Sequence, residues 1–351
     1  MSEPSLSPPR QLARLGLIGL GLGALAGAFA WTGGWLPSER LTPQRLVDRM
    51  EANAGLHPGY RRAHPRGLCV AGYLDSSGAL APWSQAALLQ PGRIPVRGRL
   101  SIGGGNPHAA DTSVPVRSLA LMLQQGDGQQ WRMALNTPPV LAVATPEAFY
   151  QQLAAMRPQP PTGKPDPARM QAFFAAHPES VAFRTWAAGH VPSDSFASSR
   201  FHSINAFYLI DDQDRRQAVR WAMVPELPAQ PLKDPAPAAD LLQHDLLERV
   251  ARGPVRWQWR FTLAAADDAI DDPSQPWPEG RQEIDAGALV IEHAEPQLGG
   301  DCYGLNFDPL VLPDGVEPSA DPILRARSAA YAESYRRRTA EGAPRLAGGQ
   351  P

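Results

Sequence analysis

The side chains best suited to chemistry lie in a short cationic stretch early in the chain. His64 is surrounded by Arg61, Arg62 and Arg66, and the apolar run 68–74 follows directly. An imidazole exchanges a proton near neutral pH, and guanidinium groups bind carboxylates and phosphates. The stretch therefore indicates an anion-binding edge beside a proton-transferring group, with a solvated basic loop as the simpler alternative.

The backbone at His64 is restricted by the residue that follows it. Pro65 disfavours the helical conformation of the preceding residue, so we expect His64 to be held extended at the mouth of a strand. Arg62 and Arg66 have no assigned role, and we expect both to be solvated.

A second set of candidate groups lies in the last predicted helix, residues 322–338. Arg327, Tyr331 and Arg338 are four and seven residues apart, so they project from one helix face. A cation one turn from a phenol favours the phenolate, which is a ligand of iron. An amphipathic surface helix with solubilising arginines explains the same spacing, and from these residues alone both interpretations stay open.

The composition limits the kinds of protein that this chain encodes. With 351 residues, 43% of them apolar, it has enough material for one large domain or two average ones. A net charge of −2 argues against a nucleic-acid partner. The 38 prolines and 31 glycines indicate a loop-rich protein rather than a helical bundle.

The elements that position these groups are mostly short strands. Apolar, turn-bounded runs predict a barrel or sandwich, with a few helices and a proline-rich connection at 157–167 that suits neither a helix nor an inner strand. The predicted strands are 68–74, 96–102, 118–123, 131–135, 203–210, 217–223, 255–264 and 286–291, and the predicted helices begin at Pro43, Pro146, Arg169 and Pro322.

The first forty residues differ from the rest of the chain. Residues 15–35 carry no charge and follow Arg10 and Arg14, which is typical of a membrane-spanning segment with a cytoplasmic N-terminus. Cleavage after 28–30 (AFA) would make this segment a signal peptide instead. We expect an uncleaved inner-membrane anchor, with the rest of the chain facing the periplasm, or secreted into it if the segment is cleaved.

Two cysteines fit an exported chain in two different ways. Cys69 and Cys302 either form a disulfide or are two buried small residues, and spacing does not decide between them. No paired Cys/His spacing is present, so zinc and iron–sulfur sites are not strong candidates.

An ordered series of motifs across residues 40–340 resembles the haem catalases, most closely their shortened bacterial relatives, the catalase-related peroxidases. The resemblance implies an α+β fold, in which an antiparallel β-barrel carries external helices and a C-terminal helix delivers the axial tyrosine. The motifs are 61–67 (RRAHPRG), 99–101 (RLS), 110–112 (ADT), 136–138 (NTP), 166–167 (DP), 173–180 (FFAAHPES), 307–309 (FDP), 313–319 (PDGVEPS) and 327–331 (RSAAY).

This resemblance implies a haem b (iron protoporphyrin IX) between His64 and Tyr331. Tyr331 would be the axial metal ligand as a phenolate, and Arg327 would stabilise its charge. Phe149 would stack on the porphyrin, although an ordinary core aromatic is the alternative. The residues expected at the haem propionates are Arg61, Arg99 and Arg338.

On the peroxide side, the resemblance assigns three catalytic roles. His64 would move a proton from one peroxide oxygen to the other. Ser101 would bind the other ring nitrogen and fix the tautomer, and Asn136 would donate to the O–O bond. No other histidine, His202 included, matches a role.

The expected activity is a haem peroxidase that reduces hydrogen peroxide or organic hydroperoxides with an organic electron donor through a ferryl intermediate. Pro115 stands where the catalases carry a channel aspartate, and the chain is shorter than theirs, so we expect little dismutation. Alternatives are a hydroperoxide-rearranging enzyme similar to allene oxide synthases and a non-catalytic haem-binding envelope protein. The expected domains are an anchor (1–40), a haem domain (41–340) and a disordered tail (341–351), with a homodimer as an open alternative.

Overall fold

The computed structural model describes residues 8–33, 40–126, 128–232 and 238–343, and the chain divides into two units, 1–42 and 43–351. The first unit contains helix α1 (Pro8–Thr32), whose segment Leu12–Thr32 has a mean hydropathy of 1.7 and is long and apolar enough to cross a membrane. The expected domain boundaries remain predictions. Residues 344–351 of the expected disordered tail lie outside the described residues.

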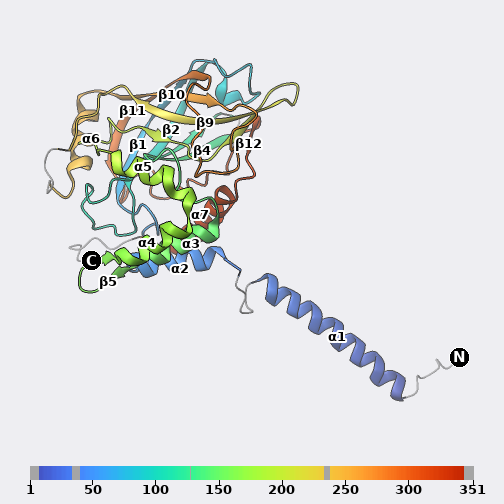
Figure 1. The fold of residues 1–351 in the computed structure, drawn as a ribbon. Helices are drawn as coiled ribbons and strands as arrows, with labels where there is room; N and C mark the ends of the chain where they lie inside the picture. The colour runs from blue at the N-terminus through green and yellow to red at the C-terminus, as the bar shows by residue number, and fades with distance from the viewer. Residues whose placement is uncertain (1–7, 34–39, 127, 233–237, 344–351) are drawn as a thin grey trace. The chain divides into compact units, whose positions relative to one another are not determined.

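The second unit is built on a closed antiparallel β-barrel (Figure 1). Eight strands follow one another round the ring in the order β10, β11, β1, β2, β3, β4, β7, β9, and the pairing of β9 with β10 closes it. This confirms the predicted α+β barrel. The strands are β1 Gly67–Ser76, β2 Gly92–Ile102, β3 Arg117–Gln124, β4 Gln130–Asn136, β7 Phe201–His202, β9 Arg216–Pro225, β10 Val255–Leu263 and β11 Glu283–Pro296, with β8 Phe207–Ile210 and β12 Val316–Pro318 outside the ring.

Alternation along the strands sends apolar side chains into the barrel and the candidate site residues to its outer face. Leu100, Leu119 and Leu135 are buried in the main core, where Trp131 packs against Trp221 with 5.2 Å between ring centroids. Burying one such side chain stabilises the fold by about 1.5–3 kcal/mol. Because successive strand residues point to opposite faces, their sequence neighbours face the helices instead.

Helices α2 (Pro43–Ala54), α3 (Pro146–Ala155), α4 (Pro167–Ala176) and α7 (Pro322–Ala340) pack against one another beside the barrel (Figure 1). Thr145 accepts a hydrogen bond from the Ala148 amide and Asp321 from the Ile323 amide at 2.8 Å, so each side chain satisfies an otherwise free amide at a helix start. Two further helices, α5 (Val181–Gly189) and α6 (Leu241–Arg252), were not predicted.

The strand predicted at 203–210 is wrong in its first half, because Ile204 has a φ of 65° and interrupts the extended chain before β8 begins. The proline-rich connection holds only a small hairpin, β5 (Pro158–Gln159) with β6 (Lys164–Pro165), outside the barrel.

Two long-range links tie the cationic stretch to the rest of the unit. Cys69 and Cys302 form a disulfide, which decides between the two alternatives for the cysteines. Arg62 is only 5% exposed and forms ion pairs with Glu51 of α2 and Glu341 after α7. The prediction of a solvated Arg62 is therefore wrong, since both carboxylates converge on it from the helical layer.

Candidate functional site

His64 lies in a bend just before β1 and does not have the extended backbone that was predicted. Its φ is 54°, and its amide donates to the Gly104 carbonyl at 2.8 Å. Pro65 disfavours the right-handed helical region for His64, but the chain adopts the left-handed region instead of the extended one. A non-glycine residue held there costs about 1–3 kcal/mol and persists only where its surroundings fix it.

One hydroxyl group links the imidazole to the candidate amide. Ser118 Oγ lies 2.9 Å from His64 Nδ1 and donates a hydrogen bond to Asn136 Oδ1. The three side chains come from the bend before β1, from β3 and from β4. His64 and Asn136 are thus brought together as predicted, through a serine that the sequence did not single out.

The hydrogen bond predicted between Ser101 and the second ring nitrogen is not among those of the described residues. Ser101 and Ser118 are cross-strand partners of β2 and β3, so both face the same side of the sheet. Among the described residues, the hydrogen-bond partner of the His64 Nδ1 atom is Ser118. The imidazole therefore interacts with the second of two adjacent serines in one row.

The surroundings of His64 keep its ring neutral. Burial, then the positive charge of Arg99, lowers the pKa of His64 to about 4, with Arg327 acting in the same direction and a hydrogen bond with the Ile102 backbone opposing them. A neutral imidazole is available as a base throughout the physiological pH range.

Three arginines predicted to bind one anion gather beside β1 and β2. Arg61 donates to the carbonyls of Cys302 at 3.1 Å and Leu305 at 2.9 Å, and Arg338 donates to the same Leu305 carbonyl at 2.9 Å. Arg99 donates to Gln297 Oε1 at 2.9 and 2.6 Å. All of these acceptors are neutral.

Without a bound anion, the positive charges of these three arginines destabilise the folded protein. Burial, then Arg338, lowers the pKa of Arg61 to about 9, and burial, then Arg61 and Arg338, lowers the pKa of Arg99 well below its ordinary value. Burial also lowers the pKa of Arg338. In the part of the chain that the structure describes, none of the three pairs with a carboxylate. Buried, unpaired guanidinium groups of this kind fit the two carboxylates of a haem.

Tyr331 lies next to this cluster on α7. Its ring packs on a small apolar group that includes the disulfide, Met122 and Phe307, and a phenolate there raises the pKa values of Arg61 and Arg99. A tyrosine oxygen beside cations is a suitable ligand for ferric iron. The donor set therefore fits a haem, which Tyr331 would bind through its iron and the arginines through its carboxylates.

Arg327, one turn before Tyr331, is fixed by a chain of polar contacts. It donates to Asn205 Oδ1 and, at 2.9 Å, to the Ala134 carbonyl. Asn205 in turn donates to Asp321 at 2.6 Å. Among the described residues Arg327 makes no hydrogen bond to Tyr331, and the predicted stabilisation of the tyrosinate by its charge stays a prediction.

Phe149 lies in the helical layer rather than on the barrel wall. It packs beside Leu141, Phe174 and the start of α7. This placement fits both a core aromatic and a ring that covers one edge of the site, and its predicted haem contact stays a prediction.

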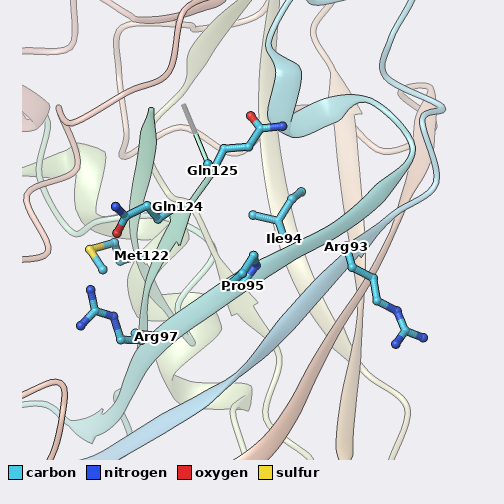
Figure 2. A pocket seen from close by; sticks show the side chains of 8 residues that line it. Arg93, Ile94, Pro95, Arg97, Met122, Gln124 and Gln125 are labelled. Atoms are coloured by element: carbon cyan, nitrogen blue, oxygen red, sulfur yellow. The ribbon is translucent and has the colours of Figure 1, made fainter. Parts of the chain in front are cut away.

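A cavity of about 390 Å³ lies along the first half of β2 (Figure 2), and its lining shares Met122 with the apolar group under Tyr331. It is lined by Arg93, Ile94, Pro95, Arg97, Met122, Gln124, Gln125 and Gly126. In Figure 2 Arg93 and Arg97 extend to opposite sides, so they do not converge on one ligand. Its lining includes none of the predicted site residues.

Sequence reasoning missed three residues of the site: Ser118, Gln297 and Asn205. Two of them gave a usable signal, because a polar residue at a buried outward position of a strand or turn needs a partner. Ser118 is the second residue of β3, directly across from Ser101. Asn205 lies in the run 203–210 that was predicted to be strand. Gln297 gave no such signal in the sequence, because its hydrogen bond with Arg99 joins segments that are far apart in the chain.

Known proteins resemble this chain over most of its length. A family model described as Catalase matches residues 45–347. The "Catalase-related peroxidase" of Synechococcus elongatus is 39% identical over 302 residues, covering 85% of this chain and 89% of that protein. That of Mycolicibacterium paratuberculosis is 32% identical over 310 residues, covering 85% and 95%.

Solved structures resemble it in fold. A bacterial catalase superposes with a TM-score of 0.72 at 21% sequence identity, over 86% of this chain and 64% of that one. A fungal catalase gives a TM-score of 0.71 at 20% identity, over 81% and 60%. The chain thus spans less than two thirds of each of these two proteins and shares their barrel.

Proposed function

The chain belongs to the catalase family and is a peroxide-degrading oxidoreductase, and from this premise we propose that it is a haem b peroxidase that reduces hydrogen peroxide or organic hydroperoxides with an organic electron donor. The observation that carries the proposal is the arginine cluster, Arg61, Arg99 and Arg338. Three cations, two of them buried and Arg61 half-buried, that meet only neutral oxygens destabilise a protein without an anionic ligand.

The cluster would bind the cofactor through its carboxylates. Arg61, Arg99 and Arg338 would neutralise the propionates, Tyr331 would hold the iron and Phe149 would cover the porphyrin. When bound, the haem supplies the iron-centred redox chemistry by which this family, which is haem-dependent, cleaves peroxide. The polar contacts of Arg327 would keep its charge one helical turn from the tyrosine.

The protein's own part in peroxide cleavage is proton transfer. The neutral imidazole of His64 takes a proton from one peroxide oxygen and returns it to the leaving oxygen, which one well-placed base can do in turn. The side-chain amide of Asn136 donates to the polarised O–O bond. Together these steps are worth roughly 10²–10⁴ in rate.

A peroxidase is favoured over dismutation by the residue at the position of the catalase channel aspartate. Pro115 offers no carboxylate there, while Arg117 is buried and donates to Ser193, Ser195 and Ser199. We propose that oxidising equivalents then pass to an organic donor. The peroxide, the donor and a second copy of the chain are the proposed partners, and nucleic acid is not.

The site of action is proposed from two features of the chain. An apolar helix near the N-terminus passes the length and composition test for a membrane span. The disulfide Cys69–Cys302 suits an oxidising compartment. Together they support a haem domain anchored at the inner membrane and facing the periplasm.

Absorbance spectra of the purified protein test the proposal. Haem should be bound, its spectrum should change on adding peroxide, and an organic dye should restore it while little oxygen is evolved. A protein without haem overturns the proposal, and oxygen evolution at the level of a true catalase overturns the peroxidase activity. Rearranged fatty-acid hydroperoxide without donor consumption identifies an isomerase, and haem that exchanges without reacting identifies a carrier.

A further inference from the structure

We infer that Ser118 is the positioning residue of the peroxide site: its hydroxyl fixes the tautomer of His64 and the amide orientation of Asn136 at the same time. This inference rests on the proposed function. It replaces Ser101, to which the family resemblance assigns the contact with the imidazole.

The strand register places three polar side chains next to one another. Ser101, Ser118 and Asn136 are direct cross-strand partners on β2, β3 and β4, so their side chains form one row on the outer face of the barrel. Ser118 is the middle member of this row and is 8% exposed. From there its hydroxyl contacts His64 Nδ1 at 2.9 Å and Asn136 Oδ1.

Counting protons on the hydroxyl settles the direction of both hydrogen bonds. A serine hydroxyl has one hydrogen, and an amide oxygen only accepts. Ser118 must therefore donate to Asn136 Oδ1 and accept from His64 Nδ1. With Ser118 accepting, the imidazole carries its hydrogen on Nδ1 and offers the Nε2 lone pair as the acceptor. The Ile102 backbone is a second acceptor near the ring, and it favours the protonated form.

This order of bonds prepares both groups for their proposed roles. A base needs an unprotonated nitrogen toward the peroxide, which the Nδ1-protonated tautomer provides at Nε2. The Asn136 oxygen is occupied by Ser118, so the two amide hydrogens remain as donors. The Ser118 hydroxyl thus orients the proton acceptor, His64 Nε2, and the hydrogen-bond donor, the Asn136 amide, for the same peroxide.

The strained backbone of His64 makes this support necessary. A residue with a φ of 54° keeps that conformation only if its surroundings fix it. The amide bond to Gly104 holds the main chain and the bond to Ser118 holds the ring. Arg99 and Arg327, the charged groups that act on this imidazole, repel its protonated form and give it no acceptor.

The experiment compares Ser118→Ala, Ser118→Thr and Ser101→Ala in the full-length haem-loaded protein. The rate of the absorbance change with hydrogen peroxide reports on proton transfer. Equilibrium binding of cyanide and of nitric oxide to the ferric protein is a second readout. Hydrogen cyanide gives up a proton when it binds, whereas nitric oxide does not.

We expect Ser118→Ala to slow the peroxide reaction and to weaken cyanide binding by roughly tenfold to hundredfold, the usual cost of losing the partner that orients such a ring. Nitric oxide binding should stay within about twofold, and Ser118→Thr, which keeps the hydroxyl, should restore both proton-linked readouts. Equal loss of both ligands in Ser118→Ala would indicate general damage and overturn the assignment. A larger loss of cyanide binding in Ser101→Ala would assign the role to that serine.

Failure of this inference and failure of the proposed function give different results. If the wild-type protein binds haem but does not react with peroxide, the peroxidase proposal fails. The comparison of cyanide with nitric oxide still tests Ser118, because it requires only bound haem and a proton acceptor.

Discussion

Arg61 and Arg338 donate hydrogen bonds to the same two backbone carbonyls, those of Tyr303 and Leu305. One cation precedes β1 and the other lies at the end of α7, so the fold brings two distant positive charges onto neutral oxygens. Like charges held this close destabilise a protein unless an anion joins them. In the proposed function the cluster would be a preformed anion site, and binding of the ligand would offset its cost.

Replacing Arg99 by methionine should change stability and haem affinity in opposite directions. Removing one of three repelling buried cations should raise the unfolding free energy of the haem-free protein by about 1–2 kcal/mol. The same change should weaken haem retention by at least tenfold, because a propionate loses its partner. Thermal unfolding of the haem-free protein and the rate of haem transfer to an acceptor apoprotein measure the two effects.

Arg62→Met is the matched control for Arg99→Met. Arg62 is equally buried, but it pairs with Glu51 and Glu341, which retain access to solvent. Its loss should destabilise the protein by about 2–3 kcal/mol, somewhat less than for a fully buried pair, and leave haem transfer unchanged. If both variants respond alike, the arginine cluster is not an anion site.

Replacing His64 by alanine should leave haem bound and slow its reaction with peroxide by about 10²–10⁴-fold. Among the described residues the imidazole makes no hydrogen bond with the arginine cluster that would hold the cofactor, so binding and proton transfer should separate in this variant. Stopped-flow absorbance gives the rate, and the Soret band gives the haem content. An unchanged rate would remove the proposed base.

The reaction with peroxide should depend on pH through the neutral form of His64. Because burial and Arg99 lower the pKa of His64 to about 4, the rate should stay level from pH 8 to about 5 and fall as the pH approaches 4. Between pH 6.5 and 4 the unfolded chain binds the proton first, so stability should also decline on acidification. A rate inflection near pH 6.5 would contradict the burial of this ring.

Removing the disulfide with Cys69→Ala and Cys302→Ala together should lower the unfolding free energy by about 2–4 kcal/mol. It should also speed haem loss, because the Cys302 carbonyl accepts from Arg61 and belongs to the segment that holds Arg338. Thermal unfolding and haem transfer measure both effects. A reductant applied to the wild-type protein should reproduce them, and retention of haem in both cases would confine the disulfide to a stabilising role.

The sequence by itself determined the identity of the chemical groups and the faces on which they lie. Apolar, turn-bounded runs placed β1 to β4 within a few residues, and the helices predicted to begin at Pro146 and Pro322 are α3 and α7. These signals are local, because alternation and capping depend on residues a few positions apart. They did not bring His64, Asn136 and the arginines into one site; the resemblance to the catalases implied that arrangement.

Only the tertiary structure decided which of these groups touch. Ser101 and Ser118 have the same chemistry and face the same way, and they differ by one strand spacing of about 4.8 Å. The left-handed backbone of His64 turns its ring to Ser118, and sequence periodicity contains no such information. The partners of Arg62 and of Cys69 come from distant segments, because packing α2 and α7 beside the barrel brings together residues that no local pattern connects.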